Sequence, residues 1–333
     1  MRKRTIILGA IAALAAMAMP SAASAKAHLL KLYKVEKHVD LTGQDDVYTV
    51  SCNGTDLALD GMWRIDNVDQ DNDFVYAPFP TGSPRFDVQR SVRPVEARPT
   101  SDSDYEFAFT PTSGGDVQIK LWVTCLGRQT SPNGHFVTWS ISNQATFSAD
   151  DAGNQDVTSS SCPTGYIVVQ PGFQVTQGDA DLVTSRPSTK ADSAWQWRWD
   201  YVAGSPFQAD LFRSCLDLRS GPSNQAPPAQ HHHRIVKHFR SNDPNLPWSG
   251  TAVSSPATVK KNSISEVTLH CGDLYKGMVG GWDHGFGSPG YGKLWYMGMD
   301  PRIKSRSFKW INIDPVNDYR ANLYLVCFKD KTT

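Results

Sequence analysis

Six cysteines in three equivalent settings constrain the fold of this chain more than any other feature. Three of them stand in the same short line of sequence: leucine, an aromatic residue, two further residues, cysteine and an apolar residue. The line reads LWVTCL, LFRSCL and LYLVCF, and its cysteines are Cys125, Cys215 and Cys327. Residues four apart share one face of a β-strand, so the leucine and the cysteine point the same way and the aromatic residue points the other way. We expect each line to be the last strand of a structural unit.

The repetition extends upstream of each closing cysteine. An aromatic residue stands 17 or 18 residues earlier, at Phe107, Trp197 and Trp310, a few residues after a proline in each case. A second set of cysteines follows short polar and β-branched runs and opens the units. These are Cys52, Cys162 and Cys271. The shared order predicts three tandem units of similar structure.

An even number of cysteines in an exported chain predicts disulfides, although six cysteines allow many connectivities. If the three units are equivalent, each bridge joins the opening and the closing cysteine of its own unit. The predicted bridges are Cys52–Cys125, Cys162–Cys215 and Cys271–Cys327. Each bridge would stabilise its unit by roughly 4 kcal/mol in the chain-entropy model.

Composition favours strands joined by turns. Glutamate, which favours helices, occurs four times, whereas aspartate, which favours turns and caps, occurs 29 times. Short strands separated by turn signals are typical of antiparallel sandwiches. We therefore predict an all-β fold of three tandem disulfide-closed antiparallel β-sandwich modules. The expected boundaries are 26–128, 129–219 and 231–333 for the modules and 220–230 for a linker.

The second unit has the fullest form of the motif. It reads Cys162-Pro163-Thr164-Gly165, then Ser185-Arg186-Pro187, then a tryptophan strand from Trp195 to Trp199, then Cys215. This pattern resembles a small repeat module of secreted bacterial proteins of unknown function, especially actinobacterial ones. The other two units depart from it, since neither has the proline after its opening cysteine and the third lacks Ser-x-Pro. The resemblance implies a β-sandwich and no particular chemistry.

The N-terminus predicts export. Arg2, Lys3 and Arg4 precede the 15-residue apolar run TIILGAIAALAAMAM, and Ala23-Ser24-Ala25 then offers a small-residue cleavage site. The run is shorter than the ~20 residues of a membrane-spanning helix. We expect residues 1–25 to be a signal peptide. The mature chain would be secreted and extracellular, without membrane insertion after cleavage.

Charge excludes one class of partner. The formal net charge of the whole chain is +0, and loss of the leader would remove three basic residues and no acidic ones. Because there is no strongly basic field, we expect no nucleic-acid partner. A cell-envelope or extracellular polymer, or a surface protein, is the expected partner.

Two stretches raise the question of a metal. Asp69, Asp71 and Asp73 have the spacing of a calcium loop, but Phe74 replaces the required glycine and no glutamate closes the loop. In the stretch HHHRIVKHF, His231 and His233 would share one strand face. We expect no cofactor and no metal, with calcium as the weak alternative.

Two aromatic stretches could bind a ligand. Trp195, Trp197 and Trp199 share one strand face, which predicts a place in the core, although an exposed face of this kind would be a platform for stacking sugars. The glycine-rich segment GGWDHGFGSPGYGKLWYMG is interpreted as a long loop or hairpin and is the stronger candidate. Its candidate ligand-binding residues are Trp282, Phe286, Tyr291 and Trp295.

Catalytic motifs are absent from the sequence. It has no zinc-protease helix motif and no phosphate-binding loop, and GFGSPG has Phe286 in the place of the first glycine of a nucleophile elbow. We predict a secreted, non-catalytic binding or structural protein of the bacterial exterior. The alternative is a secreted hydrolase that acts on polysaccharide with aspartates as acid and base.

Overall fold

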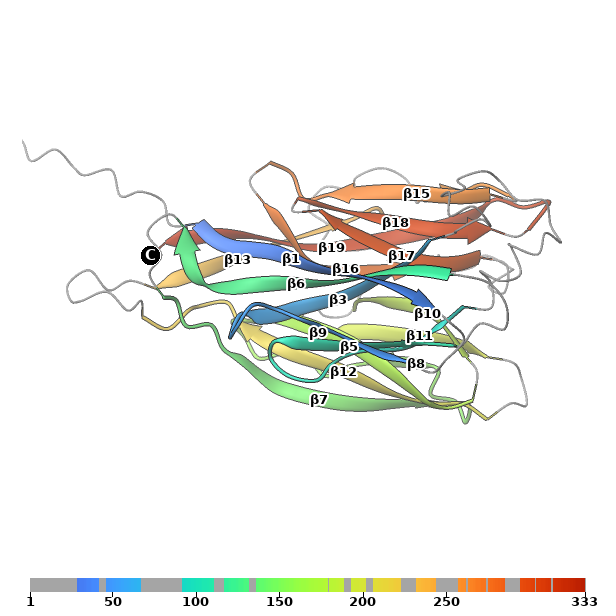
Figure 1. Cartoon of the computed structure of the whole chain (residues 1–333), viewed down its shortest axis with the longest axis horizontal. Helices are drawn as coiled ribbons and strands as arrows, with labels where there is room; N and C mark the ends of the chain where they lie inside the picture. The colour runs from blue at the N-terminus through green and yellow to red at the C-terminus, as the bar shows by residue number, and fades with distance from the viewer. Residues whose placement is uncertain are drawn as a thin grey trace, which may run out of the picture.

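A computed structural model of the chain shows an all-β protein. It describes residues 29–41, 46–66, 92–110, 117–131, 136–178, 180–188, 193–201, 206–222, 232–243, 257–261, 263–273, 275–284, 294–302, 304–312 and 314–332. Within these ranges no residue is helical, and the strands run mostly along the long axis of the molecule (Figure 1).

The strands form three sheets whose pairs are all antiparallel. Sheet 1 has the order β1 (Leu29–Leu41), β6 (Val117–Ser131), β3 (Leu57–Asp66), β17 (Leu294–Arg302), β18 (Ser305–Asn312), β15 (Ser263–His270). Sheet 2 has the order β2 (Val47–Ser51), β5 (Asp104–Phe109), β4 (Pro94–Pro99), β9 (Tyr166–Gln177), β12 (Gln208–Asp217), β7 (Ile141–Asp150). Sheet 3 has the order β13 (His233–Ser241), β19 (Tyr319–Thr332), β16 (Lys276–Asp283), β10 (Ala180–Pro187), β11 (Trp195–Tyr201), β8 (Asp156–Thr158), and β14 (Ala257–Val259) also pairs with β19.

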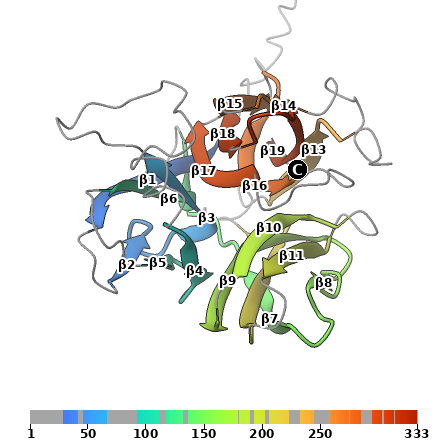
Figure 2. The same ribbon diagram turned by 90° about the vertical axis from the view of Figure 1, so that its right-hand side faces the viewer.

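Each sheet combines strands from two of the predicted modules, called here segment 1 (26–128), segment 2 (129–219) and segment 3 (231–333). Sheet 1 joins segments 1 and 3, sheet 2 joins segments 1 and 2, and sheet 3 joins segments 2 and 3. The joins are β3 with β17, β4 with β9, and β10 with β16. Viewed along the long axis of the molecule, the three segments form three groups of strands around a common centre (Figure 2). The prediction of tandem sandwiches did not include this sharing, which covers strand edges that separate units would leave open.

Two glycines allow the strands to come close at these joins. A Cβ atom on Gly172 in β9 would lie 2.8 Å from the carbonyl oxygen of Ala97, and one on Gly281 in β16 would lie 2.7 Å from that of Ser185. Real side chains do not tolerate such contacts with backbone, so only glycine permits the approach. The two positions correspond, because Gly172 pairs with Phe212 and Gly281 with Tyr324, each the aromatic residue of a closing-cysteine line.

The predicted disulfide pairing is confirmed. The bridges are Cys52–Cys125, Cys162–Cys215 and Cys271–Cys327, and the structure contains no free cysteine. The opening cysteines lie just outside strands and the closing cysteines lie on β6, β12 and β19. In segment 1, Cys52 follows β2 of sheet 2 whereas β6 belongs to sheet 1, so the bridge connects two different sheets within one segment.

The tryptophan strand belongs to the core, as the sequence predicts. Trp195, Trp197 and Trp199 are 1%, 0% and 3% exposed, and Trp199 contacts Phe173 and Phe207 edge-on or tilted. A stacking platform for sugars is therefore not available on this strand. Its indoles instead fill the space between the strands of segment 2.

Several predictions concern residues outside the described ranges. They include the signal peptide at 1–25, the calcium-loop candidates Asp69, Asp71 and Asp73, and His231. In the described part of the chain, no helix has the length and apolar character needed to cross a membrane.

Candidate ligand-binding site

Three aromatic rings from the three segments meet at the centre of the molecule. The leucine of each closing-cysteine line pairs with one of them: Leu121 with Trp63, Leu211 with Phe173, and Leu323 with Trp282. The ring centroid of Trp63 lies 5.9 Å from that of Phe173 and 5.6 Å from that of Trp282, both in edge-on geometry. Strands β3, β9 and β16 therefore hold corresponding positions around this aromatic trio.

A small pocket lies beside the trio, where β3, β9 and β16 end and β4, β10 and β17 begin. We call it the central pocket. Its lining residues are Trp63, Val92, Arg93, Pro94, Ala180, Asp181, Leu182, Val183, His284, Leu294 and Tyr296. Its volume is about 40 Å³, enough for two or three water molecules or for the tip of a larger ligand.

His284 is the most unusual residue of the central pocket. Its side chain is 4% exposed, and neither ring nitrogen has a hydrogen-bond partner among the residues that the structure describes. The imidazole instead contacts Trp310 edge-on, with 5.1 Å between ring centroids. Burial, and then the positive charge of Arg198, lower the pKa of His284 to about 3. The ring is therefore neutral near pH 7 and can both donate and accept one hydrogen bond.

The other two segments place aliphatic side chains where segment 3 has His284. The residue two positions beyond the aromatic ring of the trio is Ile65 in segment 1 and Val175 in segment 2. A buried polar group without a partner costs about 1–3 kcal/mol, which an aliphatic residue at the same place avoids. At this position segment 3 has a histidine whose burial lowers stability, although the fold accepts an aliphatic residue there.

Two further polar groups of the central pocket lack partners. Tyr296 stacks on Trp282 with 3.9 Å between ring centroids, but its hydroxyl forms no hydrogen bond, and neither does Nε1 of Trp63. Burial, and then the negative charge of Asp60, raise the pKa of Tyr296 well above 10, so the hydroxyl stays protonated. Both groups are neutral hydrogen-bond donors.

Among the described residues, the charged lining of the central pocket consists of Arg93 and Asp181, which form an ion pair. Arg93 Nε lies 3.1 Å from Asp181 Oδ1, and both side chains are partly exposed. The two residues precede β4 and begin β10, so the ion pair links segments 1 and 2 beside the pocket. The buried wall is thus neutral and aromatic, whereas the outer part carries one positive and one negative charge.

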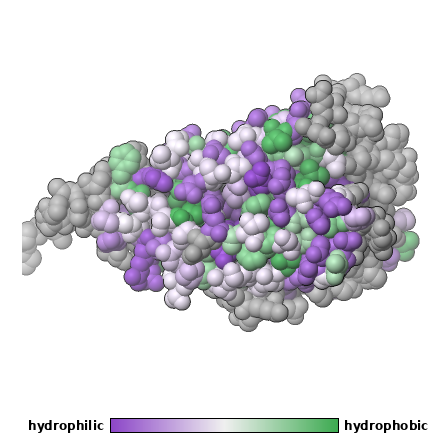
Figure 3. All heavy atoms as spheres, turned by 90° about the horizontal axis from the view of Figure 1, so that it is seen from below, coloured by the Kyte–Doolittle hydropathy of each residue, from purple (hydrophilic) through white to green (hydrophobic). Residues whose placement is uncertain are grey.

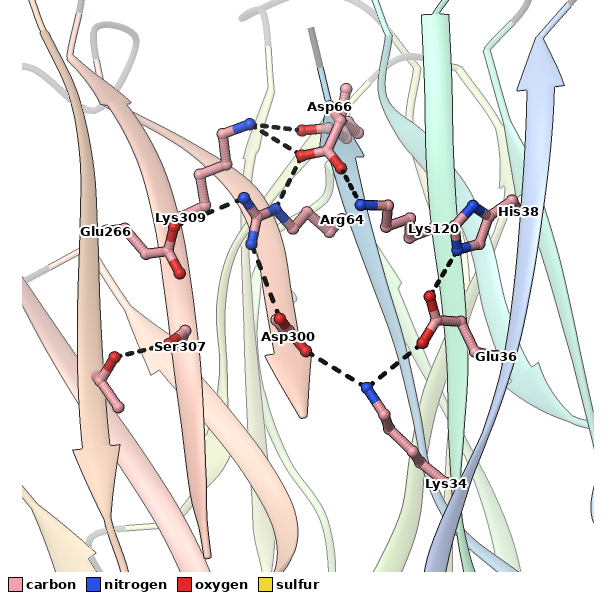
Figure 4. A network of polar contacts seen from close by, with 12 residues as sticks. Lys34, Glu36, His38, Arg64, Asp66, Lys120, Glu266, Asp300, Ser307 and Lys309 are labelled. Atoms are coloured by element: carbon pink, nitrogen blue, oxygen red, sulfur yellow. Dashed lines mark hydrogen bonds and ion pairs between the residues drawn. The ribbon is translucent and has the colours of Figure 1, made fainter. Parts of the chain in front are cut away.

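A network of ion pairs on sheet 1 differs from the central pocket, because its charged groups contact one another. Figure 4 shows a network on one face of sheet 1, in which the buried carboxylate of Asp66 contacts Arg64 at 2.8 Å, Lys120 at 3.2 Å and Lys309 at 3.2 Å. The network continues to Lys34, Glu36, His38, Glu266 and Asp300. Burial alone would raise the pKa of Asp66, but its three basic neighbours lower it below the ordinary value. Because these charges satisfy one another, the network fits a structural role across the six strands.

The predicted ligand residues are only partly placed. Trp282 is described and is 3% exposed in β16, so it belongs to the aromatic trio rather than to a flexible loop. Phe286 and Tyr291 lie outside the described residues, and the side chain of Trp295 is not described. Of the two interpretations of this segment, long loop or hairpin, the hairpin is wrong, because β16 belongs to sheet 3 and β17 to sheet 1. Residues 285–293 between these strands lie outside the described residues.

His284, Tyr296 and Trp63 were not predicted as site residues from the sequence. His284 and Tyr296 lie within the glycine-rich segment that was predicted to bind a ligand, but they were not among its candidate residues. An alignment of the three segments on their opening cysteines would have shown His284 in register with Ile65 and Val175, each 13 residues after its cysteine.

Within the described ranges, no group of three or more histidine, cysteine, aspartate or glutamate residues is arranged to hold a metal ion. His233, a weak metal candidate, is fully buried in β13. No family model matches the chain, and no curated protein is significantly similar to it.

Proposed function

We propose that this chain is a secreted, non-catalytic binding protein that recognises its ligand at the central pocket. The proposed secretion rests on the predicted leader and agrees with the three disulfides, which persist in oxidising compartments. We also propose that the three segments are copies of one sandwich-like unit. The shared positions of the cysteines, the aromatic trio and the strand joins support this interpretation.

The observation that carries the proposal is the buried, unpartnered imidazole of His284. Buried polar groups in native proteins are nearly always hydrogen-bonded, and exceptions call for an explanation such as a missing ligand. Corresponding positions hold Ile65 and Val175, so the fold itself does not require a histidine there. A ligand that supplies the missing partner explains why the polar side chain is present.

The pocket favours a neutral, hydroxyl-rich ligand. Its walls present aromatic faces and edges, and its unpartnered groups are neutral donors and one acceptor. A volume of about 40 Å³ admits a hydroxymethyl-sized group but not a whole sugar ring, because one water needs roughly 10–15 Å³. We therefore propose that the pocket receives a terminal group of a saccharide polymer, while the rest of the polymer stays outside.

The surface gives less support to a broad apolar interface. On the face shown in Figure 3, polar and apolar residues are interspersed rather than collected in one large apolar area. The large hydrophobic residues that are exposed in the described ranges are Val47, Phe136 and Val316, which lie far apart in the sequence. Scattered residues of this kind are ordinary surface features.

A titration of the purified protein with a panel of neutral mono- and oligosaccharides tests the proposal. We expect calorimetry to detect binding, and His284→Val to weaken it by about tenfold or more, the worth of one good hydrogen bond. Val175→Ile is the matched control, because it changes the corresponding site of segment 2. Equal affinity of the His284→Val variant, or no binding of any saccharide, would overturn the proposal.

The polysaccharide hydrolase alternative requires two carboxyl groups about 5 to 10 Å apart in one cleft. The central pocket contains one carboxylate, Asp181, and a second described pocket contains one, Asp217. A third described pocket, around Arg306, contains none. These pockets give the alternative no support.

A further inference from the structure

A second pocket lies at the boundary between segments 2 and 3. Its volume is about 660 Å³, far larger than the central pocket. Its principal polar lining residues are Thr138, Asp217, Arg219, Ser220, His232 and Arg234. Asp217 pairs with Tyr166 at the start of β9, whereas the central pocket adjoins the region where β9 ends. The two pockets therefore lie toward opposite ends of the strands.

Two arginines face each other in this boundary pocket. Arg219 and Arg234 are partners in an isolated antiparallel bridge, so their side chains leave the backbone from directly opposed positions. The register is fixed by flanking backbone hydrogen bonds, from Ser220 N to His233 O at 2.9 Å and from Ile235 N to Leu218 O at 2.7 Å. Like charges directly opposite one another destabilise a strand pair.

The two guanidinium groups have no ion-pair partner among the described residues. Both side chains are exposed, and neither has an ion pair with a described carboxylate. The acidic member of the lining, Asp217, accepts a hydrogen bond from the backbone N–H of Arg219 at 2.9 Å through Oδ1. Its carboxylate lines the same pocket but forms no ion pair with either guanidinium, so the two arginines exceed the one described carboxylate of the lining.

The remaining polar groups add to this arrangement. His232 Nδ1 donates a hydrogen bond to the carbonyl oxygen of Ser220 at 2.8 Å, which fixes the position of the imidazole beside the arginines. The Ser220 hydroxyl accepts from His233 N at 2.8 Å and donates to Gly221 O at 2.7 Å. The serine thus holds the backbone of both strands, which keeps Arg219 and Arg234 in register.

We propose that the boundary pocket binds a tetrahedral oxyanion, such as a phosphate or sulfate group on an extracellular polymer. A guanidinium binds such a group through two parallel hydrogen bonds, and two opposed guanidiniums offer more donors than a carboxylate can accept. The large volume leaves room for the chain that bears the anion. This site is separate from the central pocket, so the protein would have two recognition sites of different chemistry.

Calorimetric titration of the full mature chain tests this site with inorganic phosphate, glycerol phosphate, sulfate and acetate as separate probes. We expect phosphate or sulfate to bind more tightly than acetate. Arg219→Gln and Arg234→Gln should each weaken binding about tenfold or more. The affinity of the wild-type protein should also fall as salt concentration rises.

Arg320→Gln is the matched control, because it removes the same charge from an exposed position at the far end of β19. It should leave the affinity within twofold of wild type. Thermal stability is a second readout. Without anion, Arg234→Gln should raise the melting temperature by removing the repulsion. Phosphate should raise the melting temperature of the wild type and of Arg320→Gln more than that of Arg234→Gln. The proposal fails if all three variants weaken binding equally, or if no anion binds.

The comparison among probes identifies the ligand chemistry. Preference for glycerol phosphate over sulfate indicates a phosphate-bearing polymer, and the reverse indicates a sulfated one. His284→Val should bind these anions as the wild type does. Loss of anion binding in that variant would contradict two separate sites, whereas loss of saccharide binding alone concerns only the central pocket.

Discussion

Two groups of buried polar side chains near the centre of the molecule differ in one respect. Asp60 accepts a hydrogen bond from Gly280 N at 2.9 Å and lies near Arg306, which donates to Thr124 Oγ1 at 3.0 Å and to backbone carbonyls. His284 and the Tyr296 hydroxyl, by contrast, have no partners. Both groups are buried. Asp60 and Arg306 form several hydrogen bonds with the protein, although Nε of Arg306 forms none, whereas the His284 ring and the Tyr296 hydroxyl form none with the described residues.

We interpret the first group as structural and the second as available to bind a ligand. Asp60 belongs to segment 1 whereas Gly280 and Arg306 belong to segment 3, so their contacts hold two segments together. Gln170 in segment 2, three residues before Phe173 as Asp60 is before Trp63, donates from its side chain to the carbonyl oxygens of Ser101 and Asp102. The ring nitrogens of His284 form no hydrogen bond with another described residue, and their burial therefore costs stability.

Replacement of Arg306 should have the largest effect. Arg306→Met would leave Asp60 without its neighbouring positive charge and several carbonyls without donors, and breaking such a buried charge arrangement typically costs about 3–5 kcal/mol. Urea unfolding at pH 7 measures the change. Arg302→Met is the control, because Arg302 is exposed and close in sequence. A loss below about 1 kcal/mol would mean that Arg306 is not a structural link.

The pH dependence of Asp60 should have the next largest effect. Burial raises the pKa of Asp60 to about 7, although Arg306 and the Gly280 N–H act in the opposite direction. Between the unfolded and folded pKa values the folded chain therefore binds one more proton than the unfolded chain. This contribution to stability is fully present below about pH 4 and is lost as the pH rises through 7. The loss amounts to at most roughly 4 kcal/mol.

Asp60→Asn checks this expectation, because the amide keeps an acceptor for Gly280 N and does not ionise. Denaturant unfolding of the variant and the wild type should be compared from pH 4.5 to 8.5. We expect the difference between them to grow steadily toward high pH in favour of the variant. A difference that does not change with pH would show that Asp60 stays ionised in the folded protein.

The smallest change in stability is expected for substitution of His284. It should be a gain in stability, whereas substitution of a structural histidine would cause a loss. His284→Val should stabilise the protein by about 1 kcal/mol at pH 7.5, because it removes a buried group without a partner. The folded pKa of about 3 lies below the ordinary value, so the histidine costs further stability as the pH falls below about 6.5. The advantage of the variant should therefore increase at pH 5. Destabilisation by His284→Val would place the histidine with Asp60 and Arg306 as a structural residue.

Local patterns in the sequence predicted the strands and the bridges. The closing lines place leucine and cysteine on one face, and the equivalence of the three lines was enough to pair Cys52 with Cys125 and the other cysteines likewise. The burial of Trp197 followed from strand periodicity and from the size of the indole. These features depend on residues close together in the sequence or on its repetition.

The sharing of sheets between segments could not be predicted in the same way. The pairing of Arg64 with Gly298 or of Ala97 with Phe173 depends on which strand edges meet in space, and no spacing in the sequence encodes this. Gly172 and Gly281 were the available signal, since glycine inside a strand often marks a close approach of another backbone. The central pocket exists only because of these joins, which explains why its residues were missed.

The strands that make up sheet 1 also limit the order in which the parts of the molecule can fold. This sheet contains β1, which begins at Leu29, and β18, which ends at Asn312, so it cannot form until nearly the whole chain has been synthesised. Pairings so distant in sequence pay a large loop-closure entropy and slow folding. The disulfides span only 73, 53 and 56 residues, so each can form within its own segment beforehand. We therefore expect assembly in two stages, with oxidised segments first and a slower closure of the ring of sheets afterwards.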